Sequence, residues 1–286
     1  MIQLAIRFVK YLTISFSYTT IGMKEGCKMI LSDQPHVHYN KNQLLEVICQ
    51  IRFPAILKID SEAPARFQDQ IRRDFPRYYV RQERVIQPSQ GSEPPQTVVV
   101  NNHNFVSADG TWKINLTKEF FSISTVRYTN WEQFARKLDL PFAQFIQTYQ
   151  PAYFSRIGLR YQNAFSREAL QMEDRPWRDL IEPHFLGILS LEDANEAAIH
   201  KSSTEIEMQL PNGCYLKAHS GPGTIKRSDG KGEDQHRFIL DEDLFLSGQY
   251  SAAQVAWSLQ QLHENAFRVF RGGITQLLHS ALEPDA

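Results

Sequence analysis

LLEVICQIRF, residues 44–53, carries the pattern on which the predicted fold rests. Leu45, Val47, Cys49, Ile51 and Phe53 share one face, and Glu46, Gln50 and Arg52 lie on the other. A period of two is typical of a β-strand that buries one of its two faces. We therefore expect all five side chains to face the core.

Similar alternation recurs along the chain and predicts several more strands. They are expected at 78–86, 97–106, 111–128, 153–165, 204–210, 214–219 and 236–246. Asp109-Gly110 and Pro211-Asn212-Gly213 supply turn residues between such stretches, which predicts two antiparallel hairpins.

Helical spacing of apolar residues marks three other regions. A helix is expected over 62–75, and another region begins after Asn130 as its N-cap. Pro141 is expected to divide that second region and to open a short new helix. Residues 251–283 form the last helical region, and Gly272-Gly273 predicts a kink or break in it, because two interior glycines cost about 2 kcal/mol relative to alanine.

Two segments are predicted to be surface loops from their composition. Residues 87–96 are rich in Pro, Ser and Gly, and residues 221–235 are rich in Gly and charge. The whole pattern predicts an α+β fold, a mostly antiparallel sheet with helices packed on one face. Strands and helices recur in a similar order, which suggests two similar β-α-β-β-α halves, 29–150 and 151–286, the second ending in a long broken helix.

Composition narrows the functional classes. The chain has 286 residues with 31 Lys+Arg and 32 Asp+Glu, for a net charge of -1, so no bulk attraction to nucleic acid or to an anionic membrane is expected. The three cysteines, Cys27, Cys49 and Cys214, are widely spaced and odd in number, which favours a reducing compartment over a disulfide framework. We expect a cytoplasmic protein with no membrane association.

Residues 1–28 are expected to be a non-native or mistranslated extension. Their apolar run is interrupted by Ser, Tyr and Thr, so it fits neither a signal peptide nor a spanning helix well. Lys24-Glu25-Gly26 can be encoded as AAG-GAG-GGN, which reads as a bacterial ribosome-binding site, and Met29 follows at a plausible distance.

Several motifs together resemble a sporadically distributed prokaryotic family of uncharacterised proteins of similar length. They are PHVHYNKNQLLEVICQIRFP (35–54), LTKEFFSISTVRYTNWEQF (116–134), SRIGLRYQN (155–163), FILDEDLF (238–245), LHENAFRVF (262–270) and ITQLLH (274–279). The resemblance implies a start near Met29, but it implies no activity, cofactor or catalytic residue.

The strand SRIGLRYQN holds the first candidate site. Alternation places Arg156, Arg160 and Gln162 on one face, where two guanidinium groups could grip an acidic ligand or partner. The alternative is that they pair with carboxylates across the sheet. Asp241 and Asp243 also share a strand face, so they could hold Mg²⁺ or Ca²⁺, or instead meet those arginines as ion pairs.

Other polar motifs are weaker. His36-x-His38 could ligate a metal but lacks a third ligand, and His263, Glu264 and His279 lack the HExxH spacing. Basic and aromatic residues over 66–84 could contact single-stranded nucleic acid, or form a solvated surface. Gly221-Pro222-Gly223 could cradle a phosphate, or belong to a hairpin loop.

No catalytic constellation emerges from these patterns, so we predict no cofactor and no metal site. The favoured function is a non-enzymatic binding or protein-interaction module, with a homo-oligomer or a protein as partner and Arg156, Arg160, Gln162, Asp241 and Asp243 as candidate contacts. The alternatives are a metal-dependent hydrolase or nuclease using Asp241, Asp243 and a histidine, or a nucleic-acid-binding protein.

Overall fold

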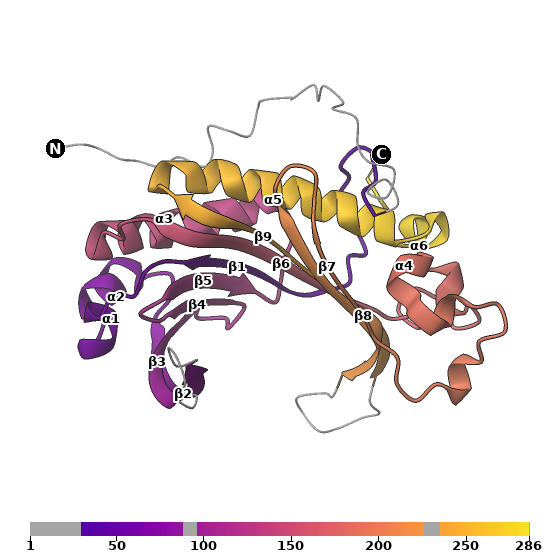
Figure 1. Ribbon diagram of the computed structural model, residues 1–286, viewed down its shortest axis with the longest axis horizontal. Helices are drawn as coiled ribbons and strands as arrows, with labels where there is room; N and C mark the ends of the chain where they lie inside the picture. Colours follow the sequence, from indigo (N-terminus) through magenta and orange to yellow (C-terminus); the bar gives the residue numbers. More distant parts are fainter. Residues whose placement is uncertain (1–29, 88–95, 226–234, 286) are drawn as a thin grey trace. The chain divides into compact units, whose positions relative to one another are not determined.

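The residues that the structure describes form one nine-stranded sheet with helices, which confirms the predicted antiparallel α+β class. The computed structural model describes residues 30–87, 96–225 and 235–285 (Figure 1). The predicted extension at 1–28, residues 88–95 of the predicted loop at 87–96, and residues 226–234 of the predicted loop at 221–235 lie outside the described residues. The strands are β1 (Leu44–Arg52), β2 (Arg77–Gln87), β3 (Gln96–Val106), β4 (Trp112–Leu116), β5 (Phe120–Thr125), β6 (Phe154–Phe165), β7 (Thr204–Gln209), β8 (Tyr215–Ile225) and β9 (Gln235–Tyr250).

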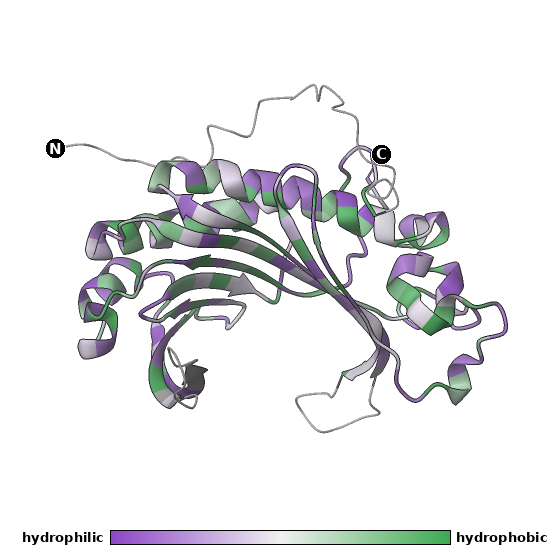
Figure 2. Cartoon of the chain, in the orientation of Figure 1, coloured by the Kyte–Doolittle hydropathy of each residue, from purple (hydrophilic) through white to green (hydrophobic). Residues whose placement is uncertain are grey.

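The helices lie between and after these strands. They are α1 (Lys58–Ser61), α2 (Ala65–Ile71), α3 (Trp131–Tyr149), α4 (Pro183–Leu186), α5 (Ala252–Gly273) and α6 (Gln276–Ala281), with short 3₁₀ helices at Trp177–Asp179, Gly187–Ser190 and Glu196–Ala198. Polar and apolar residues alternate along helices and strands alike (Figure 2).

The strand order is β2-β3-β4-β5-β1-β6-β9-β8-β7. The first strand of each predicted half, β1 or β6, therefore lies near the centre of the order. Its neighbour on the outer side is the last strand of the same half, β5 for β1 and β9 for β6. Contacts within the chain define two compact units. Among described residues, the first contains 48–157 and 247–258, and the second contains 30–47, 158–246 and 259–285.

The core of the first unit is an aromatic cluster beneath α2 and α3. Phe121 of β5 lies 5.7 Å from Phe142 and 5.4 Å from Phe145 of α3, measured between ring centroids. Phe67 of α2 lies 5.3 Å from Phe105 of β3. All five are fully buried, so both helices cover the same apolar face of this part of the sheet.

In the second unit, α5 covers one face of the sheet. The rings of Phe165 on β6 and Phe270 on α5 lie 6.1 Å apart, and the Tyr161 hydroxyl is 2.9 Å from Nδ1 of His263. Since successive side chains of a strand point to opposite faces, Arg160 and Gln162 lie on the face that α5 does not cover.

Several local predictions were wrong. The single strand expected over 111–128 is two strands, β4 and β5, which pair antiparallel. The helix expected over 62–75 is shorter, because α2 begins at Ala65 after Pro64 and ends at Ile71. Leu45 is 37% exposed, although Val47, two residues further along the same face, is fully buried. Pro141 does not divide the second helical region. It lies inside α3, whose buried side chains continue on both sides of it.

The Gly221-Pro222-Gly223 segment is a strand and not the loop that its composition suggested. Residues 221–225 belong to β8 and pair with β9 in continuous register, with Pro222 opposite Phe238. The backbone of Ser202 approaches so closely that a Cβ at Gly221 would lie 2.3 Å from its carbonyl oxygen. Glycine is therefore used here for close backbone approach.

Candidate functional site

The structure joins three of the predicted site residues in a cross-strand cluster. Nε of Arg160 on β6 donates to Oδ1 of Asp241 on β9 at 2.6 Å, and Nη2 donates to Oδ2 of the same carboxylate. Nε2 of Gln162 also donates to that Oδ2, at 3.1 Å. The two strands are neighbours in the sheet, so the alternation of each one places these groups on a common face.

This arrangement occupies the guanidinium group of Arg160. The hydrogen bonds to Asp241 raise the pKa of Arg160 despite partial burial, and Asp241, Asp243 and Glu46 add attraction. The Asp241 side chain is only 13% exposed, so its paired oxygens face little water. This bidentate ion pair, with Gln162 as a third donor, stabilises the sheet. Nε and Nη2 of Arg160 are both engaged by Asp241.

The other two predicted residues, Asp243 and Arg156, have different surroundings. Asp243 is two residues further along β9 and faces Lys217 of β8 in register. Arg156 belongs to the first unit, where its charge lowers the pKa of the buried Cys49 thiol against the larger raising effect of burial.

The histidines meet in a way that the sequence did not indicate. His36 lies 5.6 Å from His38 and 5.0 Å from His263 of α5, between ring centroids, and it stacks on Phe267 at 4.2 Å. His279 bonds instead to the Tyr39 hydroxyl at 2.9 Å. Within the described ranges, no three His, Cys, Asp or Glu side chains are arranged to hold a metal ion.

The basic stretch 66–84 is divided between α2, a turn and β2. Arg72 pairs with Asp69 at 3.7 Å, and Nη2 of Arg77 donates to the carbonyl of Ser107 at 2.7 Å. Tyr79 is 50% exposed. The two arginines thus have local partners within the fold.

A polar groove in the second unit was missed by the sequence reasoning. It has a volume of about 400 Å³ and lies where the segment after β6 meets the 3₁₀ helix Glu196–Ala198. We call it the 167–197 groove. It is lined by Arg167, Glu173, Asp174, Arg175, Pro176, Arg178, Ala194, Asn195, Glu196 and Ala197.

Arg167 and Glu196 form the fixed part of this groove. Nη1 of Arg167 donates to Oε2 of Glu196 at 2.9 Å and to the Arg175 carbonyl at 2.8 Å. Its guanidinium lies over the ring of buried Trp177, 4.5 Å from the centroid. The backbone N–H of Trp177 donates to the other oxygen of Glu196 at 2.5 Å. These contacts hold both side chains in one geometry.

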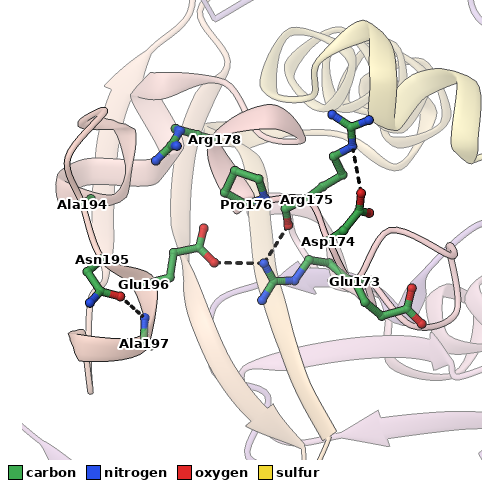
Figure 3. A pocket seen from close by; sticks show the side chains of 10 residues that line it. Glu173, Asp174, Arg175, Pro176, Arg178, Ala194, Asn195, Glu196 and Ala197 are labelled. Carbon is green, nitrogen blue, oxygen red and sulfur yellow. Dashed lines mark hydrogen bonds and ion pairs between the residues drawn. The ribbon is translucent and has the colours of Figure 1, made fainter.

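Arg175 and Arg178 form the part of the 167–197 groove whose contacts are loose enough to be replaced by those of a ligand. Nε of Arg175 lies 3.8 Å from Asp174, and its Nη1 lies 3.8 Å from Asp179, in a side chain that is 51% exposed. Arg178 is exposed and has no ion pair with any residue in the described part of the chain. Figure 3 shows Arg178 and Glu173 on opposite sides of the lining.

One sequence signal could have indicated this groove. EDRPWRD, residues 173–179, carries two arginines and three acids around a proline and a tryptophan. The tryptophan is the buried anchor, and the proline keeps the segment extended before the 3₁₀ turn at Trp177–Asp179. The partner Glu196 is distant in sequence, so the site itself was not readable from spacing.

Comparison with protein-family models and with curated proteins found no match for this chain. Among the described residues, no helix has the length and apolar character needed to cross a membrane.

Proposed function

We propose that this protein is a non-enzymatic binding module that holds an acidic segment of a protein partner in the 167–197 groove. One observation carries the proposal. Arg175 and Arg178 are exposed and line the same groove as Arg167, whose guanidinium group is already held by Glu196 and Trp177.

The geometry favours exchange of ligands at Arg175. Its ion pairs with Asp174 and Asp179 are long, and Asp174 is 80% exposed, so they contribute little stability. A carboxylate from a partner can replace them with shorter, bidentate hydrogen bonds. Arg178 has no internal pair among the described residues to break.

The fixed residues define where such a segment would lie. Arg167 is neutralised by Glu196, and Trp177 is packed against Phe238 with 5.3 Å between ring centroids. This floor does not have to rearrange when a ligand arrives, which reduces the entropic cost of binding. Glu173 lies at the opposite side of the lining from Arg178, so the carboxylates of a bound acidic segment are expected to lie near Arg178 (Figure 3).

The test uses a fluorescein-labelled hexaglutamate peptide, with a hexaglutamine peptide as its uncharged counterpart, in fluorescence anisotropy. We expect the acidic peptide alone to bind, and binding to weaken at high salt because the contacts are exposed. The double variant Arg175→Gln/Arg178→Gln should bind about tenfold more weakly or worse, as the loss of charged hydrogen bonds implies.

Arg72→Gln is the matched control. Arg72 is also exposed and also pairs loosely with an acid, Asp69 at 3.7 Å, but it lies in the first unit. Equal binding of both peptides, or an equal loss in the control and the double variant, would contradict the proposal.

A further inference from the structure

The edge strand β2 carries a self-complementary charge pattern, independent of the 167–197 groove. β2 is eleven residues long and is outermost in the sheet, with β3 as its only neighbour among the described strands (Figure 1). Its other edge therefore presents a row of backbone N–H and C=O groups that no other described strand pairs. Tyr79 is 50% exposed and Val80 is 44% exposed, so both side chains are partly open to solvent.

The sequence of β2 is complementary to itself when read in the antiparallel direction. If Gln82 faces Gln82 of a second copy, Arg81 of each chain faces Glu83 of the other. Directly opposite residues of antiparallel strands lie on the same face, so two symmetric ion pairs would form. Registers centred on Arg81 or on Glu83 would instead place like charges opposite one another.

Both charges are available for this pairing. Arg81 is exposed and has no ion pair with any residue that the structure describes. Glu83 is half-buried, and its Oε1 accepts one hydrogen bond from Nδ2 of Asn102 at 3.0 Å. A carboxylate accepts several hydrogen bonds, so Glu83 can keep Asn102 and still bind an arginine.

The strand at the other end of the order lacks this property. β7 has six residues, and its two charges, Glu205 and Glu207, have the same sign. Antiparallel pairing of two β7 strands centred on 205, 206 or 207 would place glutamates opposite one another, which is destabilising. The complementary pattern is thus specific to β2.

We propose that the occupant of the β2 edge is a second copy of this chain, paired antiparallel about Gln82 in a symmetric homodimer. Such an interface is isologous, because the same residues serve both subunits.

Sedimentation velocity of charge-reversed variants tests the proposal. Arg81→Glu and Glu83→Arg should each be monomeric at concentrations where the wild type is dimeric, because each places like charges across the dyad. An equimolar mixture of the two variants restores both ion pairs and should sediment as a heterodimer. Recovery on mixing also shows that the single variants are folded. Glu207→Arg on β7 should remain dimeric.

The register has a separate test in a Cys27→Ser background. Gln82→Cys should form a disulfide-linked dimer on mild oxidation, since opposite Cα atoms in an antiparallel pair lie about 4.5–5.5 Å apart. Tyr79→Cys should not, because its copy lies about six residues away along the strand. A monomeric wild type, a mixture that stays monomeric, or equal cross-linking at both positions would overturn the proposal.

Discussion

Three successive acids on β9 have three different environments. Asp241 is held by Arg160 and Gln162, and Asp243 is half-buried opposite Lys217. Glu242 points to the other face and is fully buried, and neither carboxylate oxygen has a hydrogen-bond partner within the described residues. Burial raises the pKa of Glu242 well above its usual value, and the neighbouring charge of Asp241 raises it further. The folded protein therefore keeps this side chain protonated to a higher pH than an exposed glutamate.

Glu242→Gln should stabilise the protein more at pH 8 than at pH 5. With a raised folded-state pKa, the folded chain binds a proton that the unfolded chain releases above about pH 4.5, so wild-type stability falls as pH rises toward the folded-state pKa. The loss is about 1.4 kcal/mol for each pH unit in that window. The amide does not titrate and lacks this slope. Urea unfolding of the variant and the wild type at both pH values measures the stability difference. An equal difference at pH 5 and pH 8 would contradict the raised pKa of Glu242.

At the scale of single elements, two helices show how packing overrides local preference. α5 continues through Gly272 and ends at Gly273, and α6 begins at Gln276, so the predicted break falls just after the glycines. They are needed for close approach. A Cβ at Gly272 would lie 2.2 Å from the Ile30 carbonyl oxygen, and one at Gly273 would lie 2.5 Å from the Phe185 ring. Glycine thus allows the end of α5 to contact both segments.

α3 shows the reverse case, because it tolerates a proline in its interior. Leu138, Phe142 and Phe145 are fully buried around Pro141, and their packing outweighs the lost backbone hydrogen bond. The Asn130 side chain also fixes the start of the helix by accepting from the N–H of Gln133 at 2.8 Å.

Pro141→Ala should therefore raise the free energy of unfolding. Alanine restores the backbone donor and removes the clash with the preceding turn, a gain of up to about 3 kcal/mol in a helix interior. Loss of buried ring atoms reduces that gain. Chemical denaturation of the variant and the wild type gives the difference. A less stable variant would show that the proline ring is needed for core packing.

At the scale of the whole molecule, the second unit brings together segments from both ends of the described chain. The N–H of Ser32 donates to the Arg268 carbonyl at 3.0 Å, and Nη2 of Arg268 donates to Asp33 at 2.6 Å. The N–H of Asn40 donates to the Glu283 carbonyl at 3.0 Å. His36, His38 and His263 form a histidine cluster in the same region. A proton bound there would add positive charge where the two ends of the described chain pack together.

Acidification should destabilise this unit. Burial holds the pKa of His263 well below its usual value, and the proximity of His36 and His38 lowers it further. The unfolded chain therefore takes up a proton below about pH 6.5 that the folded chain does not, and stability falls as pH falls.

His263→Gln should reduce this loss between pH 7 and pH 5, since the amide can still bond the Tyr161 hydroxyl without titrating. Urea unfolding at the two pH values compares the variant with the wild type. Identical losses in both proteins would show that another group is responsible.

Most of the strands, the Asp109-Gly110 turn and the antiparallel α+β class are predicted correctly from the residue pattern, because period-two burial and turn chemistry are local properties. Only the folded chain shows which strands are neighbours, that Arg160 meets Asp241, and that His263 meets His36. It also decided the 167–197 groove, where Arg167 meets Glu196. These pairs are separated by 29 to 227 positions in the sequence. The spacing of residues along one strand or helix shows only which side chains share a face of that element. A site formed between elements depends on which elements pack together in the folded chain.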